Sequence, residues 1–137
     1  MALPITGRCL CGQVTYEINQ EPLAMGLCHC HSCQKETGSA YLPWLVVPTS
    51  ALQLQGTVKW YSSPGASGKD VHRGFCPNCG STMLGRPEAI GELYSVAAGC
   101  LDDRASYQPQ MHIWAEDAAP WCSLDAALAR FEQNPSE

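Results

Sequence analysis

The chain has 137 residues and no low-complexity linker, so we expect a single domain over residues 1–137 with a sizeable core. Its formal net charge is −5 and it has eight lysine and arginine residues, which argues against nucleic-acid binding because contacts to phosphates need a basic face. No apolar run approaches the ~18 residues of a membrane span, and the first residues lack the pattern of a secretory signal, so we expect a cytoplasmic protein with reduced thiols.

Short apolar segments separated by glycine and proline predict a mainly β fold. In chain order, the predicted strands are 13–18, 21–28, 40–48, 57–63, 70–75, 80–84, 91–99 and 111–116. Residues 31–39 are short and polar, and we expect one or two helical turns there that stop at Gly38. Pro43 predicts that 40–48 is an edge strand or contains a bulge, because proline has no backbone N–H to donate.

One longer helix is predicted near the C-terminal end of the chain. In LDAALARFEQ (124–133), Leu124, Leu128 and Phe131 share one helical face. Asp125 would lie favourably near the positive N-terminal end of that helix. The expected fold is therefore mainly β with one short C-terminal helix.

Nine cysteines are many for a chain of this length. In a secreted protein they would suggest disulfides, but an odd number leaves one thiol unpaired and no sequence feature supports secretion. In a reducing compartment, clustered cysteines more often bind metal ions.

The most specific cluster is Cys76-Pro-Asn-Cys79-Gly80, between the predicted strands 70–75 and 80–84. Proline fixes the entry to the turn, and glycine follows where the backbone must curl around an ion, so this C-P-x-C-G sequence predicts a zinc knuckle. The alternative is a redox-active C-x-x-C, which would need a strand–helix context. Here the residues after the motif predict a strand of a hairpin instead.

A knuckle supplies two ligands, and Cys9-Leu-Cys11 can supply the other two, since residues i and i+2 of a strand point to the same face. Four cysteines complete a closed tetrahedral site, which is structural because no position is left for a substrate. Such a site would join residue 9 to residue 79, so that metal binding would contribute to folding.

The remaining cluster, Cys28-His-Cys30-His-Ser-Cys33, has three cysteines. Three ligands with an open fourth position are the pattern of a catalytic zinc site. A different division stays open, in which Cys28 and Cys33 join the knuckle. His31 is an alternative fourth ligand at the three-cysteine site.

The sequence also resembles a known family, the glutathione-dependent formaldehyde-activating enzymes, also called the centromere-protein-V-like family. The resemblance spans residues 5–121 and is carried by G-R-C-L-C-G (7–12), C-H-C-H-S-C-Q-K-E-T-G-S (28–39), W-Y-S-S-P-G (60–65), R-G-F-C-P-N-C-G-S (73–81), A-A-G-C-L-D-D (97–103) and H-I-W with A-P-W (112–121). It implies the Mss4-like fold, with stacked antiparallel sheets around a structural zinc.

The resemblance also implies two zinc ions per chain, with Cys9, Cys11, Cys76 and Cys79 on a structural ion and Cys28, Cys30 and Cys33 on a catalytic one. It implies carbon–sulfur lyase chemistry on a small-molecule thiol or thiol–aldehyde adduct, of the type that joins formaldehyde to glutathione. A soft sulfur ligand suits the open position of a thiolate-bound zinc, which independently favours a thiol substrate.

Several residues could move the proton or hold the substrate. His29 and His31 lie next to the three cysteines, and Glu36 and His72 are further candidates. His29, however, would point away from its neighbouring sulfurs on a regular strand, so a packing role is an equal alternative. Arg73, like Lys35 and Arg8, could bind a substrate carboxylate.

Three functions are compatible with this pattern. The first is a zinc-dependent carbon–sulfur lyase, and the second is a non-catalytic zinc module that binds a protein partner, since one fold can serve both. The third is a thiol-based metal or redox sensor that uses Cys28, Cys30 and Cys33.

Overall fold

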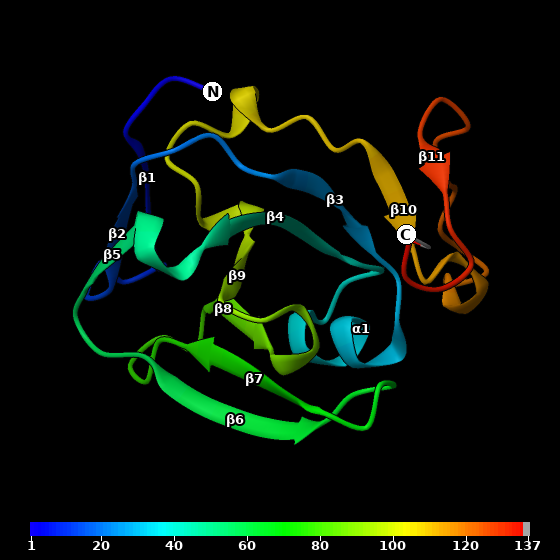
Figure 1. Cartoon of the computed structure of the whole chain (residues 1–137), viewed down its shortest axis with the longest axis horizontal. Coiled ribbons are helices and arrows are strands. Elements are labelled where there is room, and N and C mark those ends of the chain that lie inside the picture. Colours follow the sequence, from blue (N-terminus) through cyan, green and yellow to red (C-terminus); the bar gives the residue numbers. More distant parts are fainter. Residues whose placement is uncertain (136–137) are drawn as a thin grey trace.

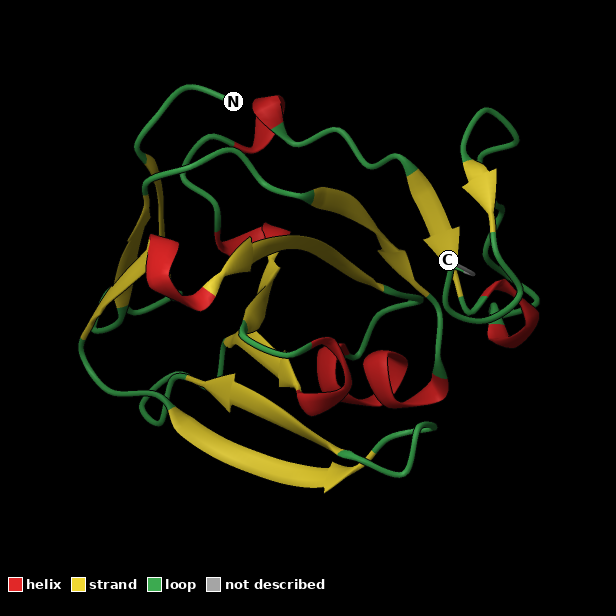
Figure 2. Cartoon of the chain, viewed as in Figure 1, coloured by secondary structure: helices red, strands yellow, loops and turns green. Residues whose placement is uncertain are grey.

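The computed structural model describes residues 1–135, which form two β-sheets and one α-helix (Figures 1 and 2). The smaller sheet has the strand order β1 (Ile5–Arg8), β2 (Thr15–Ile18) and β5 (Leu52–Gln55). The larger sheet has, from one edge to the other, β11 (Ala129–Arg130), β10 (Met111–Ile113), β3 (Ala24–Cys28), β4 (Leu42–Pro48), β9 (Leu93–Ala97), β8 (Thr82–Pro87), β7 (Asp70–Phe75) and β6 (Lys59–Pro64). The predicted mainly β fold with stacked sheets is confirmed.

Most neighbouring strands are antiparallel, but β10 runs parallel to both β3 and β11. Short 3-10 turns link several strands: η1 (Thr49–Ala51), η2 (Glu88–Ile90), η3 (Ala98–Cys100), η4 (Arg104–Ser106) and η5 (Ala115–Asp117). The large sheet curves around the only α-helix of residues 1–135, α1 (His31–Thr37), as Figure 1 shows.

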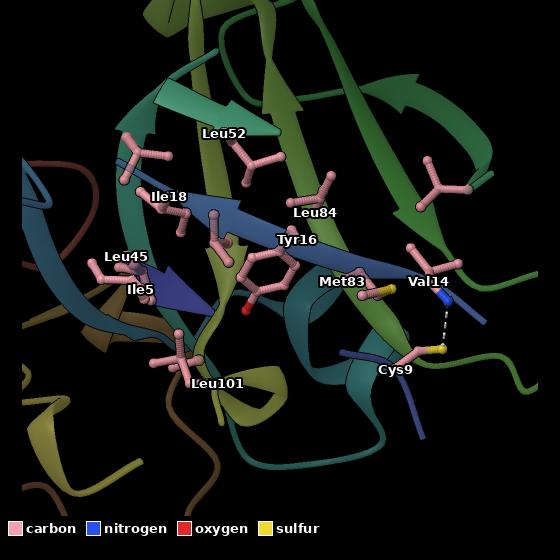
Figure 3. Packing of buried hydrophobic residues seen from close by; sticks show 14 of the residues in the cluster. Ile5, Cys9, Val14, Tyr16, Ile18, Leu45, Leu52, Met83, Leu84 and Leu101 are labelled. Atoms are coloured by element: carbon pink, nitrogen blue, oxygen red, sulfur yellow. Dashed lines mark hydrogen bonds between the residues drawn. The ribbon is translucent and has the colours of Figure 1, made fainter. Parts of the chain in front are cut away.

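The two sheets share one hydrophobic core. The small sheet and its turns contribute Ile5, Cys9, Val14, Tyr16, Ile18 and Leu52, and the large sheet contributes Leu45, Val47, Met83, Leu84 and Val96 (Figure 3). Because successive residues of a strand point to opposite faces, β4 sends Leu45 into this core and Trp44 to the other face, where it packs with Cys28 and Cys33. The large sheet therefore separates the main core from the three-cysteine cluster.

Helix α1 begins and ends where the sequence predicts. Cys30 is its N-cap, and the Cys30 sulfur accepts a hydrogen bond from the Cys33 N–H at 3.3 Å. Gly38 ends the helix with a φ of 70°, a left-handed conformation that glycine adopts without steric cost, and its N–H donates to the Gln34 carbonyl.

The predicted C-terminal helix is wrong. Residues 124–133 form a turn and then strand β11. The Asp125 carboxylate accepts a hydrogen bond from the Ala127 N–H at 2.9 Å, a local bond that competes with helix formation. The segment pairs instead with the edge of β10. The N–H groups of Ala129 and Phe131 donate to the carbonyls of Gln110 and His112. An isolated helix of ten residues is marginal in water, so tertiary pairing outweighs the helical pattern.

The expectation of an edge strand or bulge at Pro43 is also wrong, because β4 lies inside the sheet between β3 and β9. Pro43 pairs with Leu27 on β3, whereas pairing with β9 starts only at Trp44. The proline is thus tolerated at the end of the strand, before the second ladder begins.

The core packing makes a first prediction. Leu45 is fully buried, so Leu45→Ala should lower the free energy of unfolding by about 2–5 kcal/mol through lost burial and a residual cavity. Leu23→Ala, at a side chain that is 60% exposed, should change it by less than about 0.5 kcal/mol. Urea unfolding followed by circular dichroism measures both, and equal midpoints would contradict this description of the core.

Candidate metal centres

Four cysteines from two distant turns form the first cluster. Cys9 and Cys11 follow β1, and Cys76 and Cys79 lie in the turn that joins β7 to β8. Their four sulfur atoms all lie within 4.8 Å of one another, with Cys9–Cys11 at 3.6 Å and Cys11–Cys76 at 3.7 Å. A tetrahedral zinc with Zn–S bonds of about 2.3 Å requires sulfur–sulfur separations of about 3.8 Å, so this donor set fits a zinc ion.

Neighbouring polar groups support these sulfurs. The Val14 N–H donates to the Cys9 sulfur at 3.3 Å, a contact drawn in Figure 3, and the Cys79 N–H donates to the Cys76 sulfur at 3.5 Å. The Ser81 hydroxyl lies 3.2 Å from the Cys79 sulfur, and its hydrogen bond is the main cause that lowers the pKa of Cys79 to about 5. Such contacts favour thiolates and orient them, as outer groups do around bound metals.

The local backbone explains why these turns place sulfurs together. Gly12 and Gly80 each have a positive φ, of 80° and 78°, so both turns curl back immediately after a cysteine. The Gly80 N–H donates to the Cys76 carbonyl at 2.8 Å, which closes the C-P-N-C turn. Ser81 then links the two turns, because its hydroxyl accepts a hydrogen bond from the Leu10 N–H at 3.0 Å. The strands on either side pair as β7 and β8, so the predicted hairpin around C-P-N-C is present.

The second cluster is formed by three cysteines that are near one another in sequence. Cys28 ends β3, Cys30 caps α1 and Cys33 lies in the first turns of α1. Their sulfurs lie within 4.8 Å of one another, and among residues 1–135 no histidine or carboxylate completes this group. Cys28 and Cys33 are buried, whereas Cys30 is partly exposed, so the cluster has one accessible side.

The three thiols cannot all ionise easily on their own. Hydrogen bonds from Cys28 and Cys33 lower the pKa of Cys30 to about 2, whereas contacts with Cys28 and then Cys30 raise the pKa of Cys33. The hydrogen bond with Cys30 is also the main cause that raises the pKa of Cys28, to about 12. One thiolate is favoured and two more are opposed by like charge and burial. A cation between the sulfurs would remove this opposition, which fits a metal ion.

The sulfur positions favour one division of the cysteines. The knuckle sulfurs group with Cys9 and Cys11, and not with Cys28 and Cys33. Cys100 and Cys122 belong to neither cluster, and their thiols contact the carbonyls of Thr82 and Ser123. The expected split into one group of four and one group of three is therefore the geometry of the folded chain.

An ion pair lies beside the three-cysteine cluster. Arg73 on β7 reaches Glu36 on α1 with an Nε–Oε1 distance of 3.5 Å, and both side chains are more than four-fifths buried. The Arg73 guanidinium also donates to the Ser63 hydroxyl at 3.1 Å, and its charge contributes to the low pKa of Cys30. Burial raises the pKa of Glu36, with Arg73 acting against this and the nearby Cys30 adding to it.

His29 is fully buried beneath the cluster and does not face solvent. Its Nε2 lies 2.9 Å from Nδ1 of His112, and its ring contacts Tyr41 edge-on. Burial, then the proximity of His112 and Arg130, lowers the pKa of His29, so this ring stays neutral. The expectation that its ring points away from the neighbouring sulfurs agrees with this packing.

The other two histidines lie at the surface or near it. His31 is exposed at the start of α1, and its ring nitrogens are not part of the three-sulfur group. His72 on β7 hydrogen bonds to the Ser62 hydroxyl at 2.6 Å and to Glu88 at 2.9 Å, and it belongs to neither cluster.

Two features of the site could not be read from the sequence. Arg73 and Glu36 are 37 positions apart, and only the placement of α1 against β7 brings them together. The side-chain amide of Gln34 donates to the carbonyls of His29 and Asp117, which ties α1 to η5. Cys33 and Glu36 are three positions apart, which places both on one side of α1. This spacing is the one local feature of the sequence that indicates Glu36 lies near the cluster.

The structure is a mainly β fold with one group of four thiols and one group of three that could each hold a metal ion. The family model for the glutathione-dependent formaldehyde-activating enzyme matches residues 4–117. The chain therefore belongs to this family, and the resemblance in the sequence is confirmed.

Comparison with solved structures supports the fold. A crystal structure of a protein from Rhodobacter sphaeroides is 23% identical and superposes with a TM-score of 0.57, covering 72% of this chain and 88% of that one. A search of curated proteins finds no match. Within residues 1–135, no helix has the length and apolar character needed to cross a membrane.

The two clusters predict different consequences for the loss of one thiol. Cys79→Ser should remove a ligand from the closed group that joins distant turns, and so should lower the melting temperature strongly and reduce metal content. Cys33→Ser should lose one metal per chain but stay folded, because its group links neighbouring residues only. Metal analysis and thermal melting measure this, with Cys122→Ser as a control, and equal melting temperatures for the first two variants would contradict the division.

Proposed function

We propose that this chain is a zinc-dependent carbon–sulfur lyase, which makes or breaks the bond between a small-molecule thiol and formaldehyde. The observation that carries the proposal is the three-cysteine cluster, which has one ligand fewer than a closed site and one partly exposed sulfur. The family to which the chain belongs is described by glutathione and formaldehyde, which is consistent with this chemistry.

The residues suit two zinc ions with different roles. Cys9, Cys11, Cys76 and Cys79 would hold a structural ion, and Cys28, Cys30 and Cys33 a catalytic one. A zinc ion at the three thiolates would orient a substrate and favour the thiolate form of its sulfur. A reducing compartment such as the cytoplasm would keep all seven ligand thiols available.

The reaction needs a proton to change place. When the adduct forms, the thiol sulfur bonds to the aldehyde carbon, the carbonyl electron pair moves to oxygen, and the proton lost by sulfur ends on that oxygen. Glu36 lies next to Arg73 on the side of Cys30, so we assign the proton transfer to Glu36. Arg73 would donate hydrogen bonds to the oxygen on which negative charge develops.

The two histidines take different parts in this proposal. His29 would position the cluster, because its buried contact with His112 anchors the residue between Cys28 and Cys30. His31 is exposed next to Cys30 and is the alternative proton carrier.

Exchange spectroscopy with ¹³C-formaldehyde tests the proposed activity directly. The zinc-loaded protein should accelerate exchange between free formaldehyde and its thiol adduct, and Cys30→Ser should abolish the acceleration while the closed cluster keeps its metal. Cys122→Ser should behave as wild type. Two bound metals without any acceleration would overturn the proposal and favour the non-catalytic binding module.

The assignment of the proton transfer makes a separate prediction. Glu36→Gln keeps the shape of the side chain but cannot accept a proton, so kcat should fall by about 10²–10⁴-fold. His31→Gln should leave kcat within about threefold of wild type, because in this proposal Glu36 transfers the proton. If His31→Gln lowers kcat more than Glu36→Gln does, the proton is transferred by His31 and the assignment to Glu36 is wrong.

A further inference from the structure

One side of the three-cysteine cluster is an apolar wall. Buried Cys28, Cys33 and Trp44 form a small cluster on the face of the large sheet opposite the main core. Trp114, Met111 and Ile113 pack against it, all from β10 and the residue that follows. Apolar side chains thus border the proposed substrate sulfur on this side, whereas the Arg73–Glu36 pair lies near Cys30.

Trp44 carries a polar group that has no partner in the structure. Its side chain lies across Gly26, where an added Cβ would come within 2.6 Å of the indole ring. Among residues 1–135 the buried indole N–H has no acceptor, and the residue is only 7% exposed. Trp44 therefore contributes the apolar face of its ring to this side of the cluster.

Trp114 is held in an unusual conformation. It is the only non-glycine residue of the described chain with a positive φ, at φ 55° and ψ 39°. This left-handed region is unfavourable for a bulky side chain and persists only where surrounding contacts impose it, most often at functional sites.

The contacts that impose it come from the C-terminal segment. The Trp114 N–H donates to the Gln133 carbonyl at 3.0 Å, and its indole Nε1–H donates to the Asn134 side-chain oxygen at 3.0 Å. The next residue, Ala115, donates to the Phe131 carbonyl at 3.0 Å. Residues 131–134 therefore fix both the backbone and the indole ring of Trp114.

This supporting segment lies outside the part of the chain that matches the family model, which ends at residue 117. The family match covers the cysteine ligands and Trp114 itself. The segment that sets the position of the indole thus lies apart from the residues that supply the cysteine sulfurs.

Charge near the cluster also restricts the substrate. Arg73 is the cation whose field reaches Cys30, and it is already paired with Glu36. A thiol with two carboxylates would have to compete with Glu36 for this guanidinium, whereas an apolar thiol would not. Trp114, Met111 and Ile113 are partly exposed and offer such a thiol a surface on which to bury its carbon skeleton, and the buried Trp44 packs with them.

We propose that Trp114, positioned by residues 131–134 and packed with Trp44, makes this site selective for thiols with an apolar carbon skeleton over anionic thiols such as glutathione. The inference rests on the proposed function, because it takes the three-cysteine cluster as the place where the substrate sulfur binds. Trp114 is a specificity-determining residue, and Asn134 is a positioning residue that acts through it.

Thiol binding to the cobalt-substituted protein tests this without catalysis. The thiolate–cobalt absorption bands should report binding of benzyl mercaptan, glutathione and 2-mercaptoethanol in the absence of formaldehyde. Wild type should bind benzyl mercaptan about tenfold or more tightly than glutathione, as expected for burial of its apolar ring. Trp114→Ala should remove most of this preference while the affinity for 2-mercaptoethanol changes little.

A milder variant keeps the test valid if Trp114→Ala fails to fold. Asn134→Ala removes only the bond to the indole Nε1–H, from an exposed residue, and should weaken benzyl mercaptan binding severalfold. Trp121→Ala, at a tryptophan that is 75% exposed, is the matched control and should bind all three thiols as wild type does.

The outcomes separate the two proposals. If glutathione binds as tightly as benzyl mercaptan, or if Trp114→Ala and Asn134→Ala weaken all three thiols equally, the inference is overturned even where formaldehyde exchange is catalysed. If apolar thiols are preferred but no thiol is turned over, the proposed function alone fails. If no thiol perturbs the cobalt spectrum, both are overturned.

Discussion

The close approach of cysteine sulfurs within two clusters, at separations set by the fold, is the constraint on which the rest of the structure depends. Four sulfurs from turns about 70 positions apart meet within 4.8 Å, and the smaller group of three meets at the end of β3. Like charges this close oppose the ionisation of all the thiols in a cluster unless a cation neutralises them. The same geometry fits a thiolate site for a metal ion, so a bound ion would couple to folding.

The large sheet keeps the two cysteine clusters apart. One of its faces packs against the small sheet, and the four-cysteine cluster borders that core through Cys9 and Cys76. Its other face carries Trp44 and the three-cysteine cluster, with α1 in the curve of the sheet (Figure 1). The cluster at the core has four sulfurs and the cluster on the other face has three, which is the arrangement that the proposed function needs if one site is to stabilise the fold and the other is to meet a substrate.

The surroundings of the open cluster differ from side to side. An ion pair between α1 and β7 borders Cys30, and the apolar wall from β4, β10 and Trp114 borders Cys28 and Cys33. The C-terminal segment holds the wall by pairing with the edge of β10 and by bonding Trp114. In the proposed function, the reaction and the substrate preference would therefore depend on different parts of the chain, since the cysteine sulfurs come from one part and the support of the wall from another.

The sequence by itself determined the β-rich class, the helical turn at 31–38 and the grouping of the seven cysteines, because spacing within a motif and alternation along a strand are local properties. It failed at 124–133, where the helical pattern of Leu124, Leu128 and Phe131 was outweighed by pairing with β10, and at Pro43, whose strand proved internal. Only the tertiary structure decided that Glu36 meets Arg73, that His29 is buried against His112, and that Asn134 fixes Trp114. These contacts join residues that are 20 to 83 positions apart in the sequence. Such contacts depend on how whole strands and helices pack together, and a local sequence pattern does not contain that information.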